Sequence, residues 1–173
     1  MRSASPPNFS ATDLIQLLDE TLAATEAQML AKGIHVEKTL SSEQVYCHAD
    51  LDQIRQVFWN ILINAVQAMP DGGRLTVEAD YRMRDKTATD NHDPVVDPLR
   101  ELIIRIGDSG GGIAAEQTEK IFEPFVSFRT DGIGLGLSIV YQILKLHRAK
   151  IEVVSHINQG TTFILVFPCV DKL

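Results

Sequence analysis

Residues 50–69 read DLDQIRQVFWNILINAVQAM, and this stretch decides the fold. Apolar residues recur there at the three- and four-residue spacing of a buried helix. Asp50 stands three residues before Gln53, which is the spacing of an N-terminal capping box. Pro70 and the glycines after it end the pattern, because proline and glycine break helices. The stretch therefore predicts one long helix with clear ends.

One stripe of this helix carries only neutral amides, where a solvated stripe usually carries lysine and glutamate. The stripe consists of Gln53, Gln56, Asn60, Asn64 and Gln67. Asn60 and Asn64 are four residues apart, so their side chains project side by side. Amide oxygens can bind Mg²⁺ beside the phosphates of a nucleotide, and amide nitrogens can donate to phosphate oxygens. The alternative is a pair of buried asparagines that are hydrogen-bonded to nearby backbone.

A second candidate site follows an apolar strand, where Asp108 enters a glycine-rich turn that runs to Ile113. A carboxylate at a strand end can accept a hydrogen bond from an exocyclic amine such as that of adenine. Glycines such as Gly110 and Gly112 let a ring approach the backbone closely. The alternative is a local turn in which the aspartate caps backbone N–H groups.

A second glycine cluster, at residues 132–137, opens a predicted helix that runs to His147. The free N–H groups and the dipole at a helix start favour phosphate. The cluster is neither a dinucleotide-binding fingerprint nor a P-loop, because no strand precedes it and no Gly-Lys-Ser/Thr follows. Three phenylalanines lie just before it, within residues 122–129. These rings are expected to close over a ligand as a lid, to attach the loop to the core, or to do each in turn.

The other segments predict helices and strands in mixed order. We expect helices at residues 10–31, 117–122 and 137–147 and strands at residues 34–40, 74–83, 99–107, 150–155 and 161–167. Ser10 or Thr12 is expected to cap the first helix, and residues 45–47 to pair with residues 34–40. Residues 84–98 are rich in Asp, Thr, Asn and Pro, which is typical of a loop. The order favours an α+β fold, a two-layer sandwich with helices on one face of a mixed sheet.

Length and composition restrict the range of possible functions. The 173 residues fit one domain, and a formal charge of -7 argues against a nucleic-acid surface, which needs a basic stripe. No apolar run approaches the roughly 20 residues that span a bilayer, so we expect a cytoplasmic chain without membrane contact. Cys47 and Cys169 form no metal-binding pair. We expect them to be two buried thiols in a reducing compartment rather than a disulfide.

Taken in order, these segments resemble the ATP-binding catalytic domain of sensor histidine kinases, in the Bergerat-fold superfamily shared with gyrase, Hsp90 and MutL. The N box, the first glycine box, the F box and the second and last glycine boxes correspond to residues 60–65, 108–113, 122–125, 132–137 and 160–163. Each motif alone is weak. Five in the right order and spacing are specific, and they favour the functional interpretation of each motif over its alternative. Residues 52–57 and 67–73 look most like the nitrogen-regulator branch of these kinases.

The resemblance implies a Mg·ATP site. Asn64 would bind Mg²⁺ with help from Asn60, Asp108 would hold the adenine amino group, and Arg129 would reach the terminal phosphate. Arg129 would belong to a mobile lid at residues 122–131. The nucleotide-binding residues implied in full are Asn60, Asn64, Asp108, Gly110, Gly112, Ile113, Phe122, Arg129, Gly132, Gly134, Leu135, Gly136, Thr161 and Thr162.

Among these, the resemblance implies that Gly134 and Gly136 lie beside the phosphates and that Thr161 and Thr162 line the adenine end. Asn60 is the position implied for catalysis. ATPase relatives carry a glutamate there, which activates water, whereas an amide cannot take a proton. Fast hydrolysis is therefore not expected, which favours a kinase over an ATPase of the gyrase type.

The phosphoacceptor histidine is not among the five histidines of this chain, because none lies in a His-Glu-x-x-x-Pro context. The resemblance implies that the acceptor lies on a separate dimerisation hairpin and that a response regulator acts downstream. We expect residues 1–9 to be a linker after that hairpin, and residues 10–173 to be the catalytic domain, a monomer when isolated. The alternatives are a non-catalytic nucleotide sensor with the same fold and a Bergerat-fold ATPase.

Overall fold

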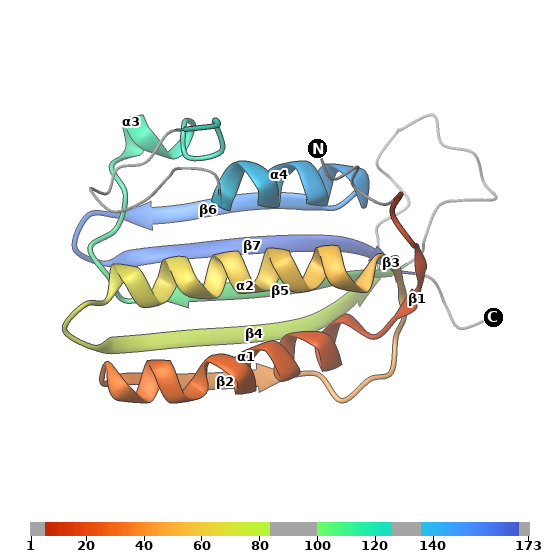
Figure 1. Cartoon of the computed structure of the whole chain (residues 1–173), viewed down its shortest axis with the longest axis horizontal. Coiled ribbons are helices and arrows are strands. Elements are labelled where there is room, and N and C mark those ends of the chain that lie inside the picture. Colours follow the sequence, from red (N-terminus) through yellow and green to blue (C-terminus); the bar gives the residue numbers. More distant parts are fainter. Residues whose placement is uncertain (1–5, 84–99, 126–135, 170–173) are drawn as a thin grey trace.

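A computed structural model describes residues 6–83, 100–125 and 136–169, with three long helices on one face of a five-stranded sheet (Figure 1). In chain order the elements are β1 (Ser10–Thr12), α1 (Leu14–Ala31), β2 (Ile34–Leu40), β3 (Cys47–Ala49), α2 (Leu51–Ala68), β4 (Gly73–Met83), β5 (Arg100–Asp108), α3 (Ala115–Thr118), α4 (Gly136–Leu146), β6 (Lys150–His156) and β7 (Gly160–Cys169). The sheet order is β2-β4-β5-β7-β6, and β1 pairs with β3 in a separate ribbon. Only β2 and β4 run parallel, so the sheet is mixed and the expected α+β sandwich is confirmed.

The core lies between the sheet and the helix layer. Strand residues alternate between the helix-covered face and the open face. On β4, for example, Leu75 and Val77 are buried whereas Glu78 is exposed. α2 lies in the middle of the helix layer, between α1 and α4 (Figure 1). Its Phe58 is fully buried and meets Phe167 of β7 edge-on, with ring centroids 6.4 Å apart, which holds α2 against the centre of the sheet.

A hydrogen-bond network holds the start of α2, where the predicted cap is confirmed. The Asp50 side chain accepts from the backbone N–H groups of Gln53 (3.0 Å) and Asn8 (2.7 Å), and these bonds lower the pKa of Asp50, the Gln53 bond most strongly. The Asp50 N–H donates to Nε2 of His147 (3.0 Å), so Nδ1 carries the imidazole proton and donates to the Ile143 carbonyl oxygen (2.8 Å). Burial lowers the pKa of His147, which keeps this tautomer neutral.

The N-terminal region differs from its prediction. β1 occupies residues that were expected to begin the first helix, and the cap of α1 is Asp13 rather than Ser10 or Thr12. The Asp13 carboxylate accepts a backbone hydrogen bond of 3.0 Å from the first turn of α1. β3 pairs with β1, so the predicted pairing of residues 45–47 with residues 34–40 is wrong. Strands of three residues are too short to show a period in the sequence.

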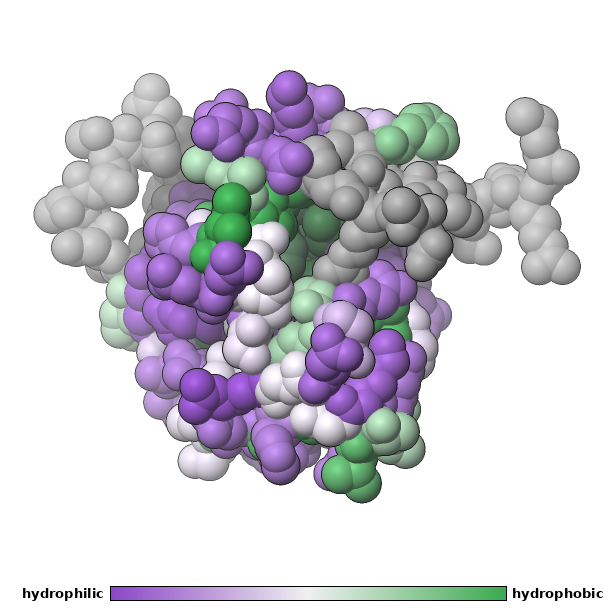
Figure 2. Space-filling view, turned by 90° about the vertical axis from the view of Figure 1, so that its left-hand side faces the viewer, coloured by the Kyte–Doolittle hydropathy of each residue, from purple (hydrophilic) through white to green (hydrophobic). Residues whose placement is uncertain are grey.

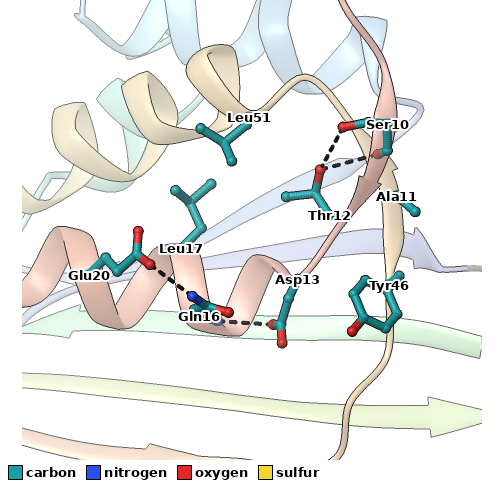
Figure 3. Close-up of a pocket in the computed structure, with 9 residues that line it drawn as sticks. All are labelled: Ser10, Ala11, Thr12, Asp13, Gln16, Leu17, Glu20, Tyr46 and Leu51. Atoms are coloured by element: carbon teal, nitrogen blue, oxygen red, sulfur yellow. Dashed lines mark hydrogen bonds between the residues drawn. The ribbon is translucent and has the colours of Figure 1, made fainter.

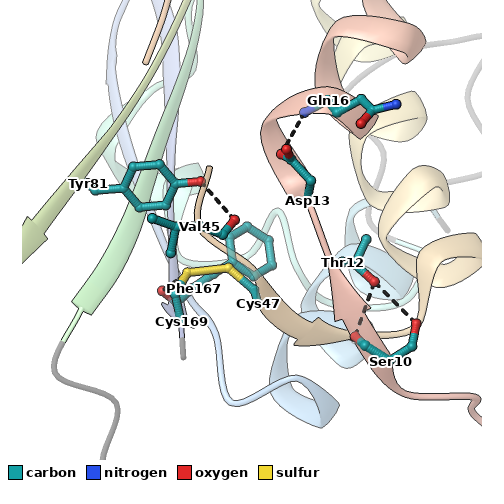
Figure 4. The surroundings of a disulfide bond; sticks show 9 residues. All are labelled: Ser10, Thr12, Asp13, Gln16, Val45, Cys47, Tyr81, Phe167 and Cys169. Atoms are coloured by element: carbon teal, nitrogen blue, oxygen red, sulfur yellow. Dashed lines mark hydrogen bonds between the residues drawn. A yellow bond between two sulfur atoms is a disulfide. The ribbon is translucent and has the colours of Figure 1, made fainter. Parts of the chain in front are cut away.

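Cys47 of β3 and Cys169 of β7 form a disulfide, with Cα atoms 4.2 Å apart and a sequence separation of 122 (Figure 4). Both residues are buried, but the prediction of two separate thiols is wrong. Beside the bridge, the Tyr81 hydroxyl donates to the Val45 carbonyl oxygen (3.2 Å) (Figure 4). Burial raises the pKa of Tyr81 to about 12. The bridge and this hydrogen bond attach the β1–β3 ribbon to the main sheet.

The other elements follow the sequence more closely. α3 is a four-residue helix that begins two residues before the predicted one. The turn between β6 and β7 is confirmed, with positive φ at Asn158 and Gly160. The loop predicted at residues 84–98 lies outside the described residues. In the part of the chain that the structure describes, no helix is long and apolar enough to cross a membrane.

Candidate nucleotide-binding site

The second half of α2 carries the predicted metal-binding asparagines, Asn60 and Asn64, both partly buried. Asn60 Nδ2 donates to the carbonyl oxygen of Gly136, the first residue of α4, at 3.3 Å. A Cβ on Gly136 would lie 3.9 Å from the Asn60 side chain, so the two helices are in contact here. Asn60 is thus bonded to backbone, as the alternative interpretation holds. The same bond brings it to the α4 N-terminus, where phosphate is expected.

Asp108 ends β5 beside the last turn of α2. Its Oδ1 accepts a hydrogen bond from the Gly110 N–H (2.8 Å), which is the local turn that the sequence left open as an alternative. A Cβ on Gly110 would come within 2.5 Å of the Ala68 carbonyl oxygen, so only glycine fits there. This close approach holds the Asp108 turn against the helix that carries Asn60 and Asn64.

The two predicted threonines lie on opposite faces of the sheet. Asp108 pairs with Thr161 across β5 and β7, and both share the helix-covered face with the buried Leu75 of β4. Thr161 is only 6% exposed. Thr162 lies on the open face, because a Cβ on its partner Gly107 would touch the Thr162 hydroxyl at 2.9 Å. The structure therefore brings Thr161, and not Thr162, to Asp108.

The β6–β7 turn packs against the glycine turn that follows Asp108. The Asn158 N–H donates to the Gly111 carbonyl oxygen (2.8 Å), and the Ile113 N–H donates to Ser155 Oγ (2.8 Å). The sequence prediction included Ile113 but missed Ser155. The one signal for Ser155 is its place on the partly buried side of an alternating strand, which a serine shares with many structural residues.

The predicted lid is only partly described. Phe122 is partly buried, packs against the core and lies 5.6 Å from the ring of Tyr141 on α4, measured between centroids. Phe125 is 77% exposed. In this structure Phe122 therefore attaches the loop to the core, while Phe125 does not. The predicted residues Arg129, Gly132, Gly134 and Leu135 lie outside the described residues.

Asn60 and Asn64 offer amide groups at this end, and amide oxygens are possible ligands of a hard cation. No group of three acidic, histidine or cysteine side chains placed to hold a metal occurs in residues 6–83, 100–125 and 136–169. A cation here would rely on amide oxygens and on phosphate oxygens, as Mg²⁺ does in nucleotide sites. Seen from the end that carries the glycine turn, a strip of weakly polar to apolar surface runs between hydrophilic flanks (Figure 2).

A groove with a volume of about 250 Å³ lies elsewhere, beside the start of α2 (Figure 3). It is lined by Ser10, Ala11, Thr12, Asp13, Gln16, Leu17, Glu20, Tyr46 and Leu51. None of the predicted nucleotide-binding residues is among them. The groove is therefore separate from the candidate site, which lies toward the other end of α2.

A family model described as "Histidine kinase-, DNA gyrase B-, and HSP90-like ATPase" matches residues 49–171. The chain belongs to this family. Sporulation kinase A of Bacillus subtilis (strain 168) is 31% identical over 156 residues, which are 90% of this chain and 23% of that protein. ShkA, solved at full length in complex with AMPPNP, has a TM-score of 0.77 at 25% identity over 98% of this chain and 33% of its own.

The histidine kinase ThkA is similar in two solved structures. Its nucleotide-free catalytic domain has a TM-score of 0.73 at 26% identity over 94% of this chain and 97% of its own. Its complex with the response regulator protein TrrA has a TM-score of 0.70 at 25% identity over 92% of this chain and 41% of its own. The predicted Bergerat fold and the resemblance to catalytic domains of sensor histidine kinases are thus confirmed. The chain spans about a third or less of the curated relatives it matches first. Its place in the nitrogen-regulator branch stays a prediction.

Proposed function

We propose that this chain binds Mg·ATP between α2 and the turns at its C-terminal end, and transfers the γ-phosphate to a histidine on a separate dimerisation domain. One observation carries the proposal. In a chain of this family, α2 meets the start of α4 through the Asn60–Gly136 hydrogen bond and the Asp108 turn through the Gly110–Ala68 contact. The AMPPNP bound to ShkA supports a nucleotide as the ligand.

The adenine end of the proposed site is formed by Asp108, Thr161 and the glycine turn. The Asp108 carboxylate accepts from the exocyclic amine. Gly110 and Gly112 shape the turn, because a Cβ on either residue would collide with the carbonyl oxygen of Ala68 or of His156. Thr162 is left out of this proposal, because it faces the open side of the sheet.

The phosphate end lies along Asn60 and Asn64, toward the start of α4. Asn64 is the proposed ligand of Mg²⁺ and Asn60 assists it, because amide oxygens are hard ligands. When bound, Mg²⁺ supplies neutralisation of the phosphate charge. Backbone N–H groups around Gly134 and Gly136 donate to phosphate oxygens, and Arg129 is the proposed partner of the terminal phosphate.

In the proposed reaction the chain positions the reacting groups and stabilises the charge on the phosphates, and it forms no covalent bond itself. A ring nitrogen of the acceptor histidine forms a bond to the γ-phosphorus, while the bond from phosphorus to the bridging oxygen breaks and ADP leaves. The attacking nitrogen is the unprotonated one, so the proton is lost to solvent from the other ring nitrogen. Asn60 stands where a general base would activate water, and an amide cannot accept that proton. The arrangement therefore favours transfer to histidine over hydrolysis.

The proposed partners are the dimerisation hairpin that bears the acceptor histidine and a response regulator. The complex of ThkA with TrrA supports the second partner. In this proposal residues 1–9 link the hairpin to a catalytic domain of residues 10–173. That domain is a monomer when isolated, works in the cytoplasm and contacts neither nucleic acid nor a membrane.

A phosphotransfer assay tests the proposal. The chain is incubated with radiolabelled ATP, Mg²⁺ and the purified dimerisation hairpin of its parent protein. The expected product is acid-labile, alkali-stable phosphohistidine on the hairpin, with little phosphate released when the hairpin is left out. A hairpin without its histidine is the control. Rapid phosphate release by the chain alone, with no label on the hairpin, would contradict the kinase assignment and favour an ATPase.

A further inference from the structure

Ser155 lies one strand beyond the proposed adenine-binding pair. The register aligns Asp108 of β5 with Thr161 of β7, and Thr161 with Ser155 of β6. Residues directly opposite each other on neighbouring strands share a face of the sheet. These three side chains, which we name the polar row, therefore lie side by side on the helix-covered face at the end of the sheet that carries the glycine turn.

One hydroxyl group serves three contacts at Ser155. Its Oγ lies 2.8 Å from Thr161 Oγ1, donates to the Gly160 carbonyl oxygen at 3.1 Å and accepts from the Ile113 N–H at 2.8 Å. A hydroxyl has one proton to donate and two lone pairs with which to accept. A carbonyl oxygen can only accept, so the Ser155 proton goes to Gly160. Thr161 must then donate its own proton to Ser155, which is the one assignment that satisfies all three contacts.

This assignment decides what Thr161 offers to a ligand. With its proton turned toward Ser155, Thr161 Oγ1 has only lone pairs left for any other group. The Asp108 side chain beside it also offers an acceptor oxygen, as its bond from the Gly110 N–H shows. The two strand ends are closely held, because a Cβ on Gly160 would collide with the Asp108 carbonyl oxygen. The polar row therefore favours an amino group, which can donate to these acceptors, over a carbonyl oxygen, which cannot.

The same serine joins two turns of the site. Ile113 closes the glycine turn after Asp108, and Gly160 opens β7. The bond from Asn158 to Gly111 is a second link between these turns and does not involve Ser155. Loss of the Ser155 hydroxyl should therefore change the orientation of Thr161 while one link between the turns is kept.

We propose that Ser155 is a positioning residue for base selectivity, which fixes the Thr161 hydroxyl as an acceptor beside Asp108 and so favours a nucleotide whose base carries an exocyclic amine. Ser155 acts through Thr161 and does not touch the base itself. The inference rests on the proposed function, because it takes the polar row as the end of the site that meets the base.

Calorimetric titration of the chain with ADP and with inosine diphosphate tests this inference. The two ligands differ along one edge of the base, where adenine has an exocyclic amine beside an acceptor N1 and hypoxanthine has a carbonyl oxygen beside an N1–H. In Ser155→Ala the affinity for ADP should fall about fivefold, the effect of one hydrogen bond, while the affinity for inosine diphosphate stays the same or rises. Ser155→Thr keeps the hydroxyl and should restore the wild-type ratio of the two affinities.

Thr161→Val supplies a second, independent variant, because it removes Oγ1 and keeps the shape of the side chain. It should change the affinity ratio as Ser155→Ala does, and the double variant should show no further change, since the two residues act as one unit. If Ser155→Ala does not fold, Ser155→Cys takes its place as a weaker hydrogen-bonding group. Equal losses for both ligands in the serine variant, or additive losses in the double variant, would overturn the inference. Failure of the wild-type chain to bind ADP would instead contradict the proposed function.

Discussion

The two ends of α2 are held in different ways. At its start, side chains from separate segments converge, since Asp50 accepts from the Asn8 backbone N–H and His147, directly after α4, accepts from the Asp50 N–H. At its C-terminal end, α2 meets the glycine turn mainly through backbone, as at Gly110 and Ala68. The first arrangement fixes the start of the helix, whereas the second holds the turn after Asp108 against the helix that carries Asn60 and Asn64.

α4 connects these two ends. It begins with Gly136 beside Asn60 and runs toward His147, whose ring centroid lies 4.8 Å from that of Phe9. The ring of Phe9 also lies 5.4 Å from that of His48. Substitutions at the start of α2 should therefore change the free energy of unfolding, and substitutions at the site end should change ligand affinity.

Removal of the disulfide should give the largest effect on stability. The double substitution Cys47→Ala, Cys169→Ala should lower the free energy of unfolding by about 2–4 kcal/mol, because the bridge restricts a long loop of the unfolded chain. Denaturant titration without reducing agent measures this difference. The affinity for ADP should not change. The wild-type chain in reducing agent should behave like the variant, and two free thiols in the unreduced chain would contradict the assignment.

Asn64→Ala should lower ligand affinity and leave stability nearly unchanged, which is the reverse of the effect of removing the disulfide. Loss of the proposed metal ligand should weaken Mg²⁺-dependent binding of an ATP analogue at least about tenfold, or about 1.4 kcal/mol. The melting temperature should change little, because Asn64 is only partly buried. Gln56→Ala, an exposed position on the same stripe of α2, is the matched control and should leave affinity unchanged. Unchanged affinity in Asn64→Ala would remove Asn64 from the metal site.

Asp50→Ala should lower the free energy of unfolding by about 1 kcal/mol, which is the usual effect of losing an N-cap side chain. The reason is that the backbone N–H groups of Gln53 and Asn8 lose their acceptor. Asp52→Ala, an exposed position in the first turn of the same helix, is the control. Equal losses in the two variants would show that general charge near the helix start, and not the cap, is responsible.

His147 should give the smallest effect, visible as a dependence on pH. Burial lowers the pKa of His147 below its ordinary value of 6.5. As the pH falls below 6.5, the unfolded chain takes up a proton here that the folded chain does not, so the free energy of unfolding decreases. His147→Gln should flatten this decrease between about pH 7 and pH 5, measured by thermal melting. His35→Gln, on exposed β2, should keep the wild-type slope, and equal slopes in both variants would contradict the assignment.

Local sequence patterns predict the elements whose structure depends on interactions between residues that are close in the sequence. The helix at α2 was predictable because its cap, its apolar faces and Pro70 all agree. The disulfide was not, because Cys47 and Cys169 are 122 residues apart and come together only where β3 packs against β7. Once the strand register is known, the alternation of side chains along a strand places Thr161 and Thr162 on opposite faces of the sheet. Ser155 required the neighbouring strand as well, since its role depends on contacts with β7 and the glycine turn.

Calorimetric titration of the wild-type chain with AMPPNP, with and without Mg²⁺, tests the central claim most directly. We predict binding of one nucleotide per chain whose affinity depends on Mg²⁺, because the site offers amide oxygens and backbone N–H groups rather than a carboxylate cluster. No binding, or binding of equal affinity without Mg²⁺, would contradict a Mg·ATP site between α2 and the glycine turn.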